Sequence, residues 1–136
     1  MTDWFVRNAR EMEWTENAMG AYCLLAADQF AINLNVLPKD APMALYHFEP
    51  HQEGFLVLRG EATLRVGDET RALRAWDYVH LDPDVPHVIT GASDEPALVL
   101  AVGSRVGGGR ATYPEDPDPK AAYAAFGEQR VVESPL

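Results

Sequence analysis

The chain has 136 residues, of which 47% are hydrophobic and 24% charged, a composition typical of one folded domain with its own core. Its 21 acidic and 11 basic side chains give a formal net charge of −10. A nucleic-acid surface needs clustered lysine and arginine, and an anionic membrane surface attracts cations. The charge therefore argues against both kinds of partner.

The single cysteine, Cys23, excludes an intrachain disulfide, and its apolar neighbours favour a buried, unreactive thiol. The first residues do not form a charged and then apolar leader. No apolar run approaches the ~20 residues of a membrane span. We therefore expect a cytoplasmic protein.

Residues 1–29 are predicted to form an N-terminal arm, partly of strands, that packs on the main domain. Residues 4–6 and 22–25 are apolar enough for short strands. Residues 10–17 are polar and suit a loop or a helical turn.

From residue 30 onward the pattern is that of short strands at even spacing. Residues 30–36 alternate apolar side chains with alanine and asparagine, which predicts a strand that ends at Pro38. Glycine, aspartate and proline turns separate the further strand candidates, which are 43–49, 54–59, 61–67, 70–75, 77–81, 86–90 and 97–103. Such a series predicts an all-β domain over residues 30–104, an antiparallel barrel or sandwich.

Residues 105–136 are predicted to be a C-terminal loop followed by a short helix. The glycines at 107–109 precede a polar, proline-rich stretch rather than a helix, which favours an exit loop over a phosphate loop. Asp118 is placed to cap a helix with Pro119 in its first turn, ending at Gly127. The residues after this helix look loose.

The chemically suggestive side chains gather where two of these strands meet. His47 and Glu49 lie two residues apart, so on a strand they share one face. Glu53 begins the next apolar segment, and His87 follows a proline much later in the chain. Imidazoles and carboxylates at the edge of an apolar strand pair can hold a first-row transition metal.

These residues resemble the motifs of the cupin superfamily. The first motif falls on His47, Glu49, Glu53 and Gly60, and the second on residues 76–91 with His87 at its histidine position. The resemblance covers residues 43–103 and implies a small, single-domain conserved-barrel protein. Its expected fold is an antiparallel jelly-roll β-barrel with a pocket between the sheets, here followed by the short C-terminal helix. Similar barrels are often dimeric, so we expect a homodimer.

The chain departs from the family's motifs at several positions. Where the family has glycine, histidine, glycine, proline, glycine and asparagine, this chain has Ala41, Glu49, Trp76, Asp82, Asp84 and Gly91. The turn survives these changes because Asp-Pro-Asp is still a turn former. The replacement of the second histidine by Glu49 is the change that bears on metal binding.

The resemblance implies a metal site made of three imidazoles and one carboxylate. In this chain the corresponding ligands are His47, Glu49, Glu53 and His87, with His51 as a substitute ligand. Two histidines and one carboxylate are also the ligand set of non-haem Fe(II) oxygenases. The expected cofactor is thus a divalent transition metal, Fe, Mn, Zn, Ni or Cu. The alternative is a buried, hydrogen-bonded cluster without metal, with shifted pKa values.

Three functions fit this site. The first is a metal-dependent, dioxygenase-type enzyme acting on a small organic molecule. The second is a metal-free isomerase in which histidine and glutamate serve as acid and base. The third is a non-catalytic module that binds a small ligand. The motifs identify no catalytic residue. His80 lies off the motifs and is interpreted as a structural or surface residue, and Arg59, Arg65, Arg71 and Arg74 are interpreted as an exposed outer face.

Overall fold

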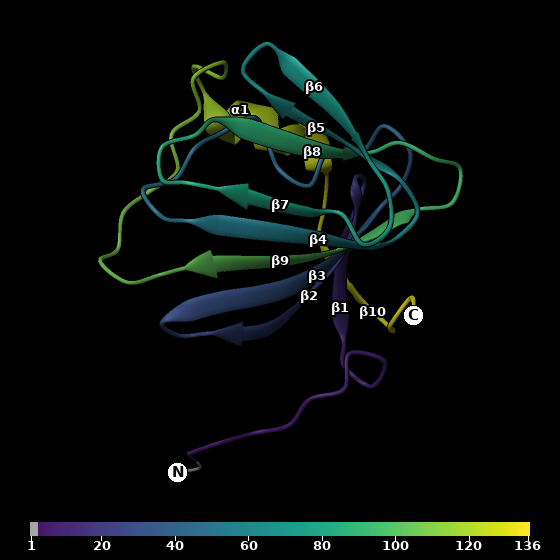
Figure 1. The fold of residues 1–136 in the computed structure, drawn as a ribbon. Helices are drawn as coiled ribbons and strands as arrows, with labels where there is room; N and C mark the ends of the chain where they lie inside the picture. Colours follow the sequence, from purple (N-terminus) through teal and green to yellow (C-terminus); the bar gives the residue numbers. More distant parts are fainter. Residues whose placement is uncertain (1–2) are drawn as a thin grey trace.

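The computed structural model describes residues 3–136 as two antiparallel sheets that face each other (Figure 1). The elements are β1 (Trp14–Asn17), β2 (Gly20–Ala27), β3 (Phe30–Leu37), β4 (Glu53–Arg59), β5 (Ala62–Val66), β6 (Glu69–Leu73), β7 (Tyr78–Leu81), β8 (His87–Gly91), β9 (Ala97–Ser104), α1 (Pro119–Tyr123), a 3₁₀ turn η1 (Ala124–Phe126) and β10 (Arg130–Val132). One sheet has the order β10-β1-β2-β3-β9-β4-β7 and the other β6-β5-β8. The all-β jelly-roll prediction is confirmed.

The main core lies between the two sheets. β4 and β9 alternate along their length, so that Val57 and Val99 point inward and are fully buried. Ile89 meets them from β8 in the facing sheet. Burying each such side chain contributes about 1.5–3 kcal/mol. The strands from β4 to β9 begin and end within two residues of the predicted bounds. Among residues 3–136 no helix has the length and apolar character needed to cross a membrane.

A second cluster covers the outer face of the larger sheet. The alternation predicted for β3 is present, but its apolar side chains point outward, where Leu34 packs with Trp14 and Cys23. The other face of β3 points inward, because Asn35 pairs with Val99 of the core. Cys23 is buried as predicted, and burial raises the pKa of its thiol.

The terminal segments differ from several predictions. Residues 4–6 are exposed and form no strand, whereas residues 22–25 lie within β2. Residues 10–17 divide into turns and β1, because Trp14 fills the second cluster and draws the chain into the sheet. The end of the chain is not loose, since β10 pairs with β1.

The predicted strand over residues 43–49 is wrong. This segment runs beside β8 but forms only isolated bridges, Pro42 to Thr90 and His47 to His87. Between the bridges it advances five residues while β8 advances three, so a continuous ladder cannot form. The extra residues bulge, and the bulge shapes the site described below.

The C-terminal helix begins as predicted. The Asp118 carboxylate accepts hydrogen bonds from the backbone N–H groups of Lys120 (3.2 Å) and Ala121 (3.4 Å), and Pro119 stands in the first turn. Phe126 at the end of η1 is buried, with its ring centroid 5.2 Å from that of Tyr123.

Three departures from the cupin motifs have a backbone explanation. Trp76 and Asp84 stand where the family has glycine, and both keep the left-handed conformation that glycine favours, with φ of 75° and 66°. At Gly91 a Cβ atom would lie 2.1 Å from the carbonyl oxygen of Pro38. The close approach of Pro38 therefore excludes an asparagine at position 91.

Candidate metal centre

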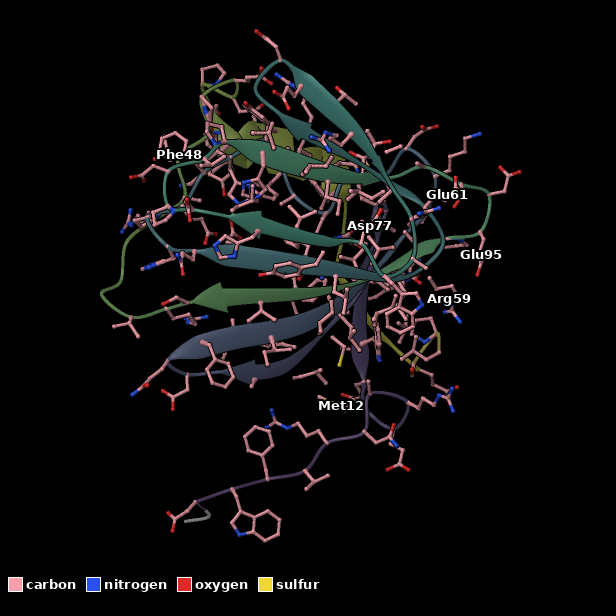
Figure 2. All side chains as sticks on the ribbon, viewed as in Figure 1. Met12, Phe48, Arg59, Glu61, Asp77 and Glu95 are labelled. Atoms are coloured by element: carbon pink, nitrogen blue, oxygen red, sulfur yellow. The ribbon has the colours of Figure 1, made fainter. Side chains whose placement is uncertain are left out.

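Three segments bring the candidate ligands together at one end of the barrel. His47 and His87 form a bridge in which each backbone N–H donates to the other's carbonyl, at 3.1 and 2.9 Å. This pairing holds their rings 4.8 Å apart between centroids. Glu53 is the first residue of β4 and pairs with Leu81 of the core, so its side chain faces the interior. Figure 2 shows this end, marked by Phe48, opposite the end that carries Arg59 and Glu95.

Both imidazoles are oriented by backbone carbonyls. Nδ1 of His47 lies 2.7 Å from the carbonyl oxygen of Leu45, and Nδ1 of His87 lies 2.9 Å from that of Val85. A carbonyl oxygen only accepts hydrogen bonds, so each Nδ1 carries the proton. The Nε2 lone pairs are therefore directed into the site, which is the arrangement that metal-bound histidines adopt.

The ligand atoms of His47, Glu53 and His87 all lie within 4.8 Å of one another. Nε2 of His87 is buried and has no hydrogen-bond partner among the described residues, although Oε2 of Glu53 lies 3.1 Å away. With the proton on Nδ1, this contact sets a lone pair against a carboxylate. A cation between the two atoms satisfies both, so these residues fit a divalent metal.

Glu49 lies beside this group but is not one of its three members. Its Oε1 is 3.7 Å from Nε2 of His47, an ion-pair contact rather than a hydrogen bond. The contact with His47 holds the pKa of Glu49 below its ordinary value. Burial lowers the pKa of His47, but the Glu49 contact, the Leu45 carbonyl and the charge of Glu53 together raise it. That Glu49 is a metal ligand stays a prediction.

The remaining histidines lie outside the group of three. His51 is half-buried and faces a separate cavity. His80 is an exposed residue of β7, with Nδ1 3.1 Å from the Tyr78 hydroxyl and Nε2 3.4 Å from Asp82. This agrees with its interpretation as a surface residue.

Two tyrosines near the centre were not among the site residues predicted from the sequence. The ring of Tyr113 lies 5.9 Å from that of His47, and its hydroxyl is 3.2 Å from the hydroxyl of Tyr123. Burial and this contact raise the pKa of Tyr123. Neither residue belongs to a motif. Only the tertiary structure reveals the position of Tyr113, because Thr112 pairs with Phe48 and so places Tyr113 beside His47.

Comparison with solved structures shows many barrels of the same fold. A sugar phosphate isomerase of the cupin superfamily from Silicibacter pomeroyi DSS-3 superposes with a TM-score of 0.67 and 22% identity, over 87% of this chain and 80% of that one. DMSP lyase DddQ from Ruegeria pomeroyi DSS-3 superposes with a TM-score of 0.61 and 21% identity, over 74% of this chain and 54% of the lyase. A Cupin 2 conserved barrel domain protein from Salinispora arenicola CNS-205 superposes with a TM-score of 0.58 and 21% identity, over 64% of this chain and 76% of that protein. At these identities the likeness establishes the fold alone.

A search of curated proteins finds no match. The family model described as Cupin domain matches residues 34–103, which include both motifs and all three clustered ligands. Because this model matches more than half of the chain, and the fold and the site agree with it, the chain belongs to the cupin domain family.

Proposed function

We propose that this protein is a metal-dependent enzyme of the dioxygenase type that acts on a small organic molecule in the barrel mouth. The observation that carries the proposal is the buried Nε2 of His87, which has no hydrogen-bond partner among the described residues and faces the Glu53 carboxylate. Two imidazoles and a carboxylate form the ligand set of Fe(II) oxygenases and leave coordination positions for substrate. The donor set also accepts Mn, Zn, Ni or Cu.

The roles of the chain's own residues follow from their positions. His47 and His87 present Nε2 because carbonyl oxygens hold their Nδ1 protons, and Glu53 supplies the charge that neutralises a cation. A bound divalent metal supplies Lewis-acid stabilisation of a substrate oxygen. Glu49, ionised beside His47, serves as the fourth ligand or accepts a substrate proton at a carboxylate oxygen.

One observation also favours a metal-free acid–base enzyme. If a proton occupies Nε2 of His87, the 3.1 Å contact with Glu53 becomes an imidazolium–carboxylate pair. Such a pair can move protons in an isomerase without any metal. Metal content separates the two candidates.

The test is elemental analysis of untagged protein after loading with Fe(II), Mn(II), Zn(II), Ni(II) or Cu(II). We expect near-stoichiometric metal in the wild type and in His80→Ala, whose imidazole lies on the exposed side of β7. The double variant His47→Ala, His87→Ala should bind none. Metal that stays in the double variant, or is absent from the loaded wild type, contradicts the proposal. Oxygen consumption with the loaded protein then distinguishes an enzyme from a binding module.

The sequence-based expectations about partners stay proposals. We propose a small-molecule ligand and a homodimer, with no nucleic acid or membrane as partner, because the net charge is −10. A cytoplasmic location belongs to the same proposal.

A further inference from the structure

A cavity of about 260 Å³ lies next to the metal centre. One side is the connection between His47 and β4, including Glu49 and His51. The other side is the exit loop after β9, including Arg105 and Arg110. The cavity therefore joins a segment that carries metal ligands to a loop far away in the sequence.

Among residues 3–136, Arg105 and Arg110 are the lysine or arginine side chains that lack a carboxylate partner and also line this cavity. The lysines and arginines that pair with carboxylates are Lys39 with Asp94, Arg59 with Glu95, Arg65 with Glu115 and Arg130 with Glu16. Within residues 3–136 neither Arg105 nor Arg110 has a carboxylate oxygen within 4.0 Å. Two guanidinium groups without a carboxylate partner, beside an imidazole, favour an anion, and their planar forks match phosphate or carboxylate oxygens.

The loop that carries Arg110 is held in place at two points. Thr112 and Phe48 exchange backbone hydrogen bonds of 2.9 and 3.0 Å. Gly109 has φ of 113°, and a Cβ atom there would lie 2.6 Å from Cγ of Pro50. Only glycine lets the loop press so closely against Pro50. The wall of the cavity is thus part of the folded barrel mouth.

Glu49 connects the cavity with the metal centre through its contact with His47. Glu49 lines the cavity, and its Oε1 is 3.7 Å from Nε2 of His47. A carboxylate on this side repels an anion and directs it toward the arginines. A molecule with an anionic group at one end can therefore place its other end at His47.

We propose that this cavity binds the anionic group, a phosphate or a carboxylate, of the small molecule that reacts at the metal centre. The proposal rests on the function proposed above, because it names the chemical class of the same substrate. It assigns Arg105, Arg110 and His51 to substrate binding. No helix follows the glycines, so the site differs from a phosphate loop.

The test uses the full-length, chelator-treated protein, so that metal cannot bind the probe. Inorganic phosphate and malonate are titrated separately at low ionic strength, and amide chemical shifts are followed by NMR. We expect one of the probes to shift the amides of residues 108–111 with a saturable curve. Arg105→Gln with Arg110→Gln should weaken that binding at least tenfold. The control pair, Arg71→Gln with Arg74→Gln, removes the same charge from exposed positions away from this cavity and should leave binding unchanged.

The response to the two probes identifies the anion, because a phosphate site and a carboxylate site both support the proposal but prefer different probes. No saturable shift with either probe overturns it, and so does equal weakening in the control pair. Metal content of the Arg105→Gln, Arg110→Gln variant is measured in parallel. If this variant binds metal normally but no anion, the metal centre and the anion site are independent. The metal measurement therefore tests the proposed function, and the anion titration tests the proposed binding site.

Discussion

Nε2 of His87 lies 3.1 Å from Oε2 of Glu53 in the buried mouth of the barrel, and the imidazole proton is held on the other nitrogen by the Val85 carbonyl. Two groups that only accept hydrogen bonds thus face each other away from water. Such a contact is unfavourable by itself and becomes favourable when a cation lies between the two atoms. The predictions about the centre depend on this relationship.

Glu53→Gln should change metal binding and stability in opposite directions. The glutamine amide can donate a hydrogen bond to Nε2 of His87, so the metal-free variant should gain about 1 kcal/mol in free energy of unfolding. Its metal affinity should fall by at least about 10- to 100-fold, the loss typical of removing a partner that merely supports a ligand, since here a charged ligand itself is lost. Chemical denaturation and metal titration measure the two effects, with the exposed Glu61→Gln as control. A loss of stability in metal-free Glu53→Gln would instead support the imidazolium–carboxylate pair.

The stability of the metal-free protein should fall as the pH rises above about 6.5. The folded-state pKa of His47 is raised, so its stabilising contribution is complete below the unfolded-state pKa of about 6.5 and is lost as the pH passes the folded-state value. His47→Asn should flatten this part of the profile. Thermal denaturation of chelator-treated protein at several pH values tests this, and an unchanged slope in the variant would contradict it.

Trp76→Gly should stabilise the protein by about 1 kcal/mol. Trp76 is exposed and has φ of 75°, a conformation that costs a residue with a Cβ atom about 1–2 kcal/mol and glycine nothing. Asp84→Gly is the comparison, and it should gain less because aspartate tolerates this conformation better. Urea denaturation of both variants measures the difference. A destabilised Trp76→Gly would show that the indole makes a stabilising contact.

The homodimer remains a prediction, and the outer face of the larger sheet is the surface to test. Phe30, Tyr78, Val102 and Val106 line one cavity of about 440 Å³ there, and all four are exposed. A second copy, related by twofold symmetry, would bury the same set of side chains on both chains. Light scattering at micromolar concentration should give a dimer mass, and Phe30→Ser with Val102→Ser a monomer mass. A monomeric wild type would remove the prediction.

Much of the fold could be predicted from local signals. The period-two pattern of β3, the turn residues between β4 and β9, and the Asp118 cap each depend on neighbours in sequence. The ligands His47, Glu53 and His87 could be identified because they fit family motifs, and the structure brings them together. A sequence pattern does not show which face of a strand is inside. The strand β3 could therefore be predicted, but not that its asparagines face the core.

Tertiary structure decided the rest of the site. Glu49 follows the bridge from His47 to β8 and lies beyond Phe48, which pairs with Thr112, so the chain there is not a regular strand. Its carboxylate contacts His47 at 3.7 Å but lies outside the group of three. Tyr113, Arg105 and Arg110 reach the barrel mouth because the exit loop pairs with Phe48, a contact between residues far apart in sequence. The sequence alone determined the strands and the ligand types, since these follow from local periodicity and motif spacing. Only the long-range packing of the exit loop determined which charged and aromatic groups surround them.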